Sequence, residues 1–211
     1  MFDELKRTWV LHVKKNSIAY LLTIFILITG IMAGAFTVIS LPSQQKNYLS
    51  KFLQEFFHSQ QNLPINHWAI FRHSLWQHFT TAFFIWIFGF FIWGSPFILA
   101  LIGIRGFYFG FTIGFMVEHY KFGGVLFSLL CILPQSIIYV PCYIAMVIIA
   151  LLYSTAGLGR GGFTYFRAQG RNNPGIYTTK LSLVFFILLI GVLIETFISP
   201  LLFPLFVWIF N

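Results

Sequence analysis

Apolar runs longer than a membrane is thick are the feature that most constrains this chain. A helix needs roughly 20 apolar residues to cross the hydrocarbon core of a bilayer, and runs of that length recur here with short polar gaps between them. Hydrophobic residues make up 58% of the sequence and charged residues only 9%, whereas a soluble protein typically carries about 25% charged residues. The sequence therefore predicts an all-α, polytopic membrane helix bundle that forms a single integral membrane domain.

The apolar runs divide into about five transmembrane helices. The predicted spans are residues 18–41, 75–93, 97–117, 123–152 and 181–199. A polar leader precedes them at 1–17, and the two longer connections are 42–72 and 154–179. Arg105 falls inside the third predicted span, where a charge is costly. Two other divisions therefore stay open: five spans with a short third helix, or four spans plus a re-entrant hairpin.

The positive charge of the chain reads as a signal of membrane topology. The formal net charge is +8, and the basic residues cluster mostly in the leader and in the 154–179 connection. Cytoplasmic segments of membrane proteins carry an excess of Lys and Arg. We therefore expect a multi-pass protein of the cell membrane with the N-terminus in the cytoplasm and the C-terminus outside. Its expected contact is with membrane lipid, and we expect no nucleic-acid partner.

The 42–72 connection, placed outside by this topology, has the pattern of an amphipathic helix. Its apolar residues recur at helical spacing, as Tyr48, Leu49, Phe52, Leu53, Phe56 and Phe57. Such a face suits a helix that lies along the membrane surface or packs on the ends of the spans. The sequence therefore predicts an external amphipathic loop.

Glycines at four-residue spacing mark two of the spans. The first span contains Gly30 and Gly34, and the third contains Gly106, Gly110 and Gly114. A stripe of glycines leaves a flat helix face that lets another helix approach closely. The pattern predicts helix packing, either within the chain or at a homodimer or partner contact.

Ionisable residues at the outer ends of the spans are candidates for a polar site. Charged groups inside a membrane are functional candidates by default. The topology places five His and Glu residues on the outer side, namely His73, His78, Glu118, His119 and Glu195. Together they suit a divalent metal or a proton relay, but their spacing matches no standard metal motif. We therefore expect no resident metal or cofactor, and a structural polar contact remains the alternative.

Two prolines predict a kink in the fourth span. Pro134 and Pro141 each free a backbone carbonyl about one turn earlier, and lipid offers no donor to satisfy it. Gln135, Ser136 and Tyr139 are the polar groups nearby. The sequence predicts a broken helix buried in the bundle, as a static kink, a hinge or a binding niche.

The same segment carries a family resemblance. The pattern Leu133-Pro134-Gln135-x-x-x-Tyr139-Val140-Pro141, within a basic-headed chain of five spans, resembles stage II sporulation protein M. The resemblance implies a scaffold of the engulfment complex in the septal membrane of sporulating cells. It would hold two membrane-anchored peptidoglycan-degrading partners, a lytic transglycosylase and an amidase/endopeptidase. Gln135 and Tyr139 stand where the wider family often has His and Glu, which counts against acid–base chemistry at this place.

Catalytic motifs are absent from the sequence. It contains no Walker loop, nucleophile elbow, HExxH or GxGxxG pattern, so we expect that the chain is not an enzyme. Two alternatives to the scaffold stay open. One is a small transporter or channel subunit acting as a homodimer, with a polar path through Arg105, Gln135 and Glu195. The other is a metal-dependent intramembrane hydrolase built on Glu118, His119 and Glu195.

Overall fold

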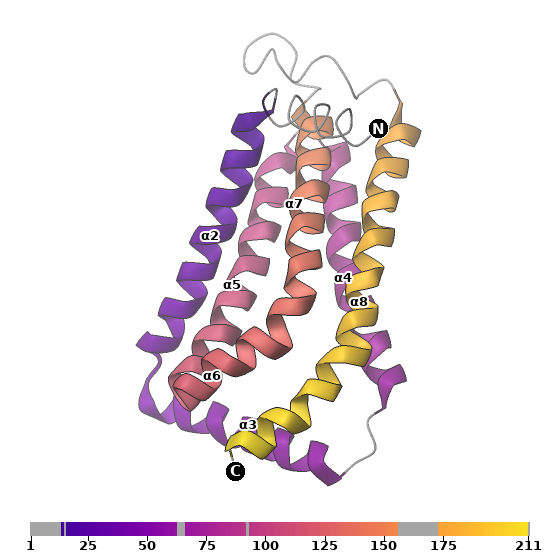
Figure 1. The fold of residues 1–211 in the computed structure, drawn as a ribbon. Helices are drawn as coiled ribbons and strands as arrows, with labels where there is room; N and C mark the ends of the chain where they lie inside the picture. The colour runs from indigo at the N-terminus through magenta and orange to yellow at the C-terminus, as the bar shows by residue number, and fades with distance from the viewer. Residues whose placement is uncertain (1–13, 15, 63–65, 92, 156–172, 211) are drawn as a thin grey trace.

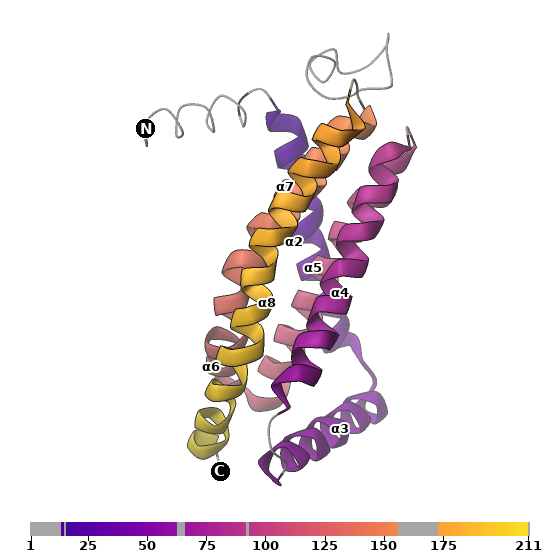
Figure 2. The same ribbon diagram turned by 90° about the vertical axis from the view of Figure 1, so that its right-hand side faces the viewer.

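The computed structural model describes residues 14, 16–62, 66–91, 93–155 and 173–210, which are almost entirely helical and contain no strand. Five long helices run side by side (Figure 1): α2 (Ser17–Ser40), α4 (His67–Phe90), α5 (Gly94–Tyr120), α7 (Leu133–Thr155) and α8 (Pro174–Phe210). A sixth, α3 (Ser43–Asn62), lies across one end of this bundle in both views (Figures 1 and 2). A short helix, α6 (Phe122–Phe127), and a π-helix, η1 (Ser128–Ile132), lead into α7. The predicted helical membrane bundle is confirmed.

Four stretches of the described chain are long and apolar enough to cross a membrane, where we expected about five. They are α2, α5, the continuous stretch Phe122–Thr155 and the Pro174–Phe197 part of α8. The predicted second span, 75–93, falls largely in α4, which is not among them because His73, Gln77 and His78 make its first half polar. The helix nevertheless packs against α5, α7 and α8. Its polar residues face the interior of the bundle in part, and they supply the site described below.

The segment predicted as an external loop, 42–72, is mostly helical. It contains α3 and the first turns of α4, which begins at His67. The side chain of Asn66 accepts a hydrogen bond from the backbone N–H of Ala69 at 3.1 Å. This contact satisfies one of the free N–H groups at the start of the helix, so α4 extends beyond its apolar part toward α3.

Glycine brings α2 and α5 into backbone contact. A Cβ atom on Gly106 would lie 2.5 Å from the carbonyl oxygen of Leu27, and one on Gly34 would lie 2.7 Å from the amide nitrogen of Phe111. Gly30 and Gly110 likewise lie directly against the opposite backbone, at Gly103 and Ile31, and Gly114 lies against Ala35. All five predicted packing glycines therefore face the α2–α5 interface within one chain. The glycine stripe is used in folding the bundle.

The predicted fourth span, 123–152, bends where its first proline lies. Figure 1 shows α6 and the start of α7 inclined to the rest of α7. The π-helical turn η1 ends two residues before Pro134, and the hydroxyl of Ser136 donates to the carbonyl oxygen of Ile132 at 2.7 Å. A π-turn shifts the pairing of backbone hydrogen bonds where proline interrupts the regular ladder, and the Ser136 hydroxyl adds a donor close to the bend. Pro141 lies inside α7, which continues through it.

The central helix of the bundle is α7. Its residues Tyr143, Met146, Val147 and Ala150 are at most 1% exposed, and they pack against α4, α5 and α8. The outer helix α2 instead presents a row of large apolar side chains, of which Leu21, Phe25, Met32 and Phe36 are each at least 66% exposed. An apolar exterior suits contact with lipid. The polar groups described next lie on the inner side of this arrangement.

Candidate functional site

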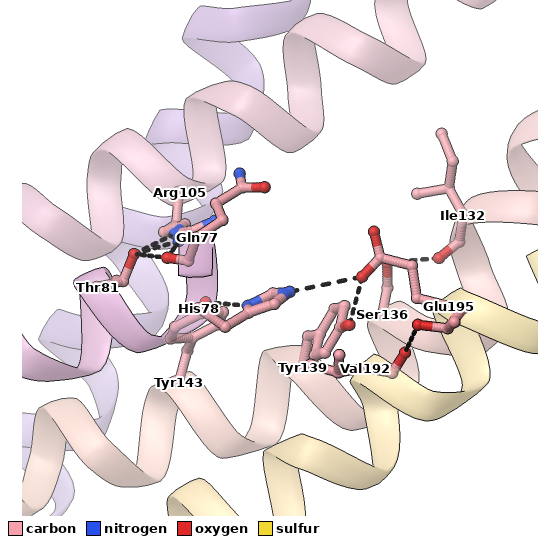
Figure 3. Close-up of polar contacts among 11 residues, drawn as sticks. Gln77, His78, Thr81, Arg105, Ile132, Ser136, Tyr139, Tyr143, Val192 and Glu195 are labelled. Atoms are coloured by element: carbon pink, nitrogen blue, oxygen red, sulfur yellow. Dashed lines mark hydrogen bonds and ion pairs between the residues drawn. The ribbon is translucent and has the colours of Figure 1, made fainter. Parts of the chain in front are cut away.

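A network of polar side chains connects four helices inside the bundle. It comprises Ser74, His78 and Thr81 of α4, Arg105 of α5, Tyr139 and Tyr143 of α7, and Glu195 of α8, and the backbone carbonyl of Gln77 joins it. Figure 3 labels all of these residues except Ser74. Their positions on α4 are three or four residues apart, which places them on one helix face. Tyr139 and Tyr143 are likewise four residues apart on α7. Local helix geometry thus directs both groups toward the same interior region.

Arg105 occupies the more buried end of the network. The side chain is 9% exposed. Its Nε donates to the hydroxyl of Thr81 at 3.0 Å, its Nη2 donates to the backbone carbonyl of Gln77 at 2.8 Å, and Nη2 also contacts the Thr81 hydroxyl. The guanidinium carbon lies 5.2 Å from the centre of the Tyr143 ring. Hydrogen bonds and a cation–π contact together offset part of the cost of burying this charge.

His78 and Glu195 form the other part of the network. The two ring nitrogens of His78 face different partners: Nδ1 lies 2.5 Å from the Tyr143 hydroxyl, and Nε2 lies 3.6 Å from a carboxylate oxygen of Glu195. Tyr139 donates to the same carboxylate oxygen at 2.5 Å, and its ring centre lies 4.1 Å from that of His78. Ser74, one turn before His78 on α4, also faces Glu195. A carboxylate held by several donors is stabilised away from water.

The network is internally satisfied. Every buried side-chain nitrogen and oxygen among the described residues has a hydrogen-bond partner. Arg105 and Glu195 carry opposite charges, so the network is neutral overall when His78 is neutral. Buried polar groups that are fully partnered and charge-balanced fix the relative positions of the helices that carry them. The arrangement therefore binds α4, α5, α7 and α8 to one another.

The predicted outer cluster of His and Glu residues separates into different places. Of the five candidates, only His78 and Glu195 meet. Glu118 and His119 lie at the end of α5 against α3, and His73 is exposed on α4. No group of three His, Cys, Asp or Glu residues within the described part of the chain is close enough to hold a metal ion. The structure thus does not bring the five candidates together as one site.

Glu118 and His119 instead hold α3 to the end of the bundle. The Lys46 ammonium lies 3.1 Å from the Glu118 carboxylate and 3.3 Å from the carbonyl oxygen of Ile39. The Ser50 hydroxyl lies 3.1 Å from Nδ1 of His119. Leu53, on the same face of α3, packs against a small apolar cluster that includes Met116. These contacts attach one face of α3 to the end of the bundle.

Replacing Lys46 by Gln is expected to loosen α3 without unfolding the bundle, because it removes the contact to Glu118 and leaves the spans unchanged. Amide hydrogen exchange in residues 43–53 would speed up while exchange in α7 stays the same. Lys51→Gln is the matched control, since Lys51 lies on the exposed side of the same helix. Equal exchange in the two variants would show that the Lys46 contact does not hold α3.

The predicted kink residues have separate roles. Tyr139 is 2% exposed and is part of the polar network. Gln135 and Pro134 are half-buried near the bend, and Pro141 is exposed. The sequence therefore pointed to four members of the network. It grouped His78 with Glu195 in the outer cluster, placed Arg105 and Glu195 on one polar path, and assigned Tyr139 to the kink.

Ser74, Gln77, Thr81 and Tyr143 were not predicted as members of the site. A usable signal was present on α4, where Ser74, His78 and Thr81 recur at spacings of four and three residues. A polar stripe with helical period in a segment that is otherwise apolar marks an inward polar face. Tyr143 gave no comparable signal, because a tyrosine in an apolar helix is ordinary.

Comparison with known proteins identifies one family. Stage II sporulation protein M matches residues 23–200, which include most of α2, all of α3 to α7 and most of α8. No curated protein and no solved structure matches the chain. The match covers the membrane helices, the polar network and the kinked segment together, and it agrees with the resemblance drawn from the pattern at Leu133 to Pro141. On this evidence the chain is a sporulation-related membrane protein that belongs to the stage II sporulation protein M family.

Proposed function

We propose that this protein is the membrane scaffold of the sporulation engulfment complex. It would recruit and hold two membrane-anchored partners that degrade peptidoglycan, a lytic transglycosylase and an amidase/endopeptidase, at the septal membrane. The family supports a sporulation role in the membrane. The observation that carries the scaffold role is α3, a helix fixed across one end of the bundle by one face and open on the other.

The open face of α3 has the composition of a contact surface. Tyr48 is two residues from Lys46 and so lies about 200° around the helix from it, away from the bundle. Tyr48 is 74% exposed and Phe52 is 62% exposed. A hollow beside them is lined by Gln44, Gln45, Tyr48 and Leu49. Aromatic side chains are the residues that most often anchor protein–protein contacts.

The distribution of charge supports placing α3 on the outer side. The start of α2, the end of α7 and the start of α8 lie at the end of the bundle opposite α3 (Figure 1). The basic leader is joined to the first of these, and the basic connection 154–179 includes the other two. By the positive-inside rule that end belongs in the cytoplasm. The open face of α3 would then meet the space that contains peptidoglycan.

The buried network supports a structural role for the charged residues of the bundle. A transport path would need polar groups that remain available to a solute or an ion. Arg105 and Glu195 instead direct their hydrogen-bonding groups to neighbouring helices. This favours a scaffold over the transporter built on the same residues.

The test is capture of the partners from sporulating cells. Affinity isolation of the tagged protein from sporulating membranes is expected to recover both hydrolases. Tyr48→Ala combined with Phe52→Ala should lower the affinity for both hydrolases, and with it their recovery, by about thirtyfold or more, because an aromatic anchor is typically worth about 2 kcal/mol or more. The abundance and membrane insertion of the variant should be unchanged, since both side chains are exposed.

Phe25→Ala is the control for this experiment. Phe25 is 66% exposed on α2, away from α3, so its removal deletes a similar aromatic group from a lipid-facing surface. Recovery of the hydrolases should be the same as with the unchanged protein. If the wild-type protein recovers neither hydrolase, and instead passes a solute across liposomes, the scaffold proposal is wrong.

A further inference from the structure

Of the side chains that form the polar network, that of Glu195 is the most exposed. The Glu195 side chain is 26% exposed, whereas that of His78 is 6% exposed. Farther in, Tyr143 is 1% exposed and Arg105 is 9% exposed. The network thus has an accessible carboxylate at one end and a fixed cation at the other (Figure 3).

Neighbouring contacts place Glu195 near the α3 end of the bundle. The carbonyl oxygen of Thr196, the next residue, accepts a hydrogen bond from Nδ1 of His67 at 3.0 Å. His67 is the first residue of α4 and follows the exposed Asn66. The two residues of α4 that face the carboxylate, Ser74 and His78, lie about two to three turns beyond His67. The carboxylate therefore lies between the start and the middle of α4, and its partly exposed side chain is the group of the network that a proton reaches first from the α3 side.

The charges of the groups around His78 are balanced in a way that allows one additional proton to bind. The neighbours on α7 are Tyr139 and Tyr143, and the neighbour on α8 is Glu195. Arg105 of α5 lies farther away, and on α4 the hydroxyl of Ser74 lies near the carboxylate. Arginine side chains are positively charged in proteins. When the imidazole is neutral and the carboxylate ionised, the four helices enclose no net charge, and one added proton gives them a single positive charge.

We propose that His78 and Glu195 form a buried proton-binding site that takes up one proton from the α3 side of the bundle. The step is a simple association: a proton leaves water, enters at the exposed carboxylate, and becomes shared by the carboxylate and the imidazole, and no other covalent bond changes. Two groups this close titrate as a pair, so the proton belongs to the pair rather than to either residue.

The site is closed on its inner side, so it binds a proton without passing it on. Beyond His78 the next group is the buried hydroxyl of Tyr143, and beyond that Thr81 is held by Arg105 and by the backbone carbonyl of Gln77. A permanently charged guanidinium at this position repels a proton that would move farther. The proposal is therefore independent of the scaffold role and differs from a channel.

Proton uptake by the purified protein in lipid nanodiscs tests the proposal. Between pH 8 and pH 5, His78→Gln, Glu195→Gln and the double variant should each bind one proton fewer than the unchanged protein. The loss should be the same in all three, because the proton is shared. As a control, Tyr143→Phe keeps both members of the pair and should retain the full count.

Two results would overturn the proposal. One is a double variant that binds as many protons as the unchanged protein, which would show that the His78–Glu195 pair does not change its protonation state between pH 8 and pH 5. The other is a double variant that loses the sum of two independent single losses. If the variants do not fold, the ¹⁵N signals of the His78 ring in the unchanged protein decide: they must change between pH 8 and pH 5. Liposomes containing the unchanged protein should show no proton flux, and a measurable flux would contradict the closed inner end.

Discussion

Gly110→Ala is expected to push α2 away from α5 and to destabilise the folded bundle. A Cβ atom at this position would overlap the backbone of Ile31, with the Ile31 Cα at 2.8 Å. Backbone cannot move aside as a side chain can, so the helices must separate. Overpacking of this kind typically costs about 1–3 kcal/mol, occasionally more. Unfolding in mixed micelles by a rising fraction of denaturing detergent would measure the loss.

Two other glycines provide matched controls for this substitution. At Gly103 the added methyl group would meet only the Cγ2 atom of Ile26, at 3.2 Å, and at Gly175 it would meet nothing within 4 Å. Gly103→Ala should therefore have a small effect and Gly175→Ala none or a slight stabilisation. If Gly110→Ala unfolds at the same detergent fraction as Gly175→Ala, the close contact between α2 and α5 is not what stabilises the bundle.

Arg105→Met is expected to cause the second large loss of stability. The substitution preserves most of the apolar volume and removes the donors to Thr81 and to the carbonyl oxygen of Gln77. It also leaves Glu195 as an unbalanced charge among the four helices. Hydrogen bonds from a charged donor are each worth about 1.5–3 kcal/mol, so a loss of about 3 kcal/mol is expected in the same unfolding assay.

A double-mutant cycle separates charge balance from simple loss of contacts. Combining Arg105→Met with Glu195→Gln restores a neutral network, so the double variant should lose less stability than the two single losses added together. Arg72→Met is the surface control, since Arg72 is exposed on α4, and it should change stability by at most about 0.5 kcal/mol. Strict additivity in the cycle would mean that Arg105 and Glu195 do not act as one network.

The structure differs from expectation at the boundary between two predicted segments. The sequence predicted a span at 75–93 and an external amphipathic loop with helical spacing at 42–72, and α4 begins at His67 and joins the two. Hydropathy averages over all faces of a helix, so the polar inner face of α4 lowered the average of a segment that lies inside the bundle. Contact with three other helices, rather than apolar composition, is what retains α4 there.

The five His and Glu candidates lie in different parts of the bundle for a related reason. Sequence reasoning placed His73, His78, Glu118, His119 and Glu195 at one membrane face, which fixes depth but not position around the bundle. In the structure Lys46 reaches Glu118 from α3, while His78 reaches Glu195 between α4 and α8. Residues at the same depth can lie on opposite sides of a five-helix bundle, and only helix order and rotation decide which of them meet.

A helical membrane bundle, a bend near Pro134 and membership of the family could all be predicted from the amino-acid sequence. Apolar length, glycine spacing and proline chemistry are local properties of the chain. Which residues these features contact could be seen only in the folded structure. The glycines of α2 and α5 face one another, and Arg105, the difficult residue of the third predicted span, is partnered by Thr81 and Gln77 of α4. Such pairings join residues far apart in the chain, and their energy depends on how the helices are rotated and ordered around α7.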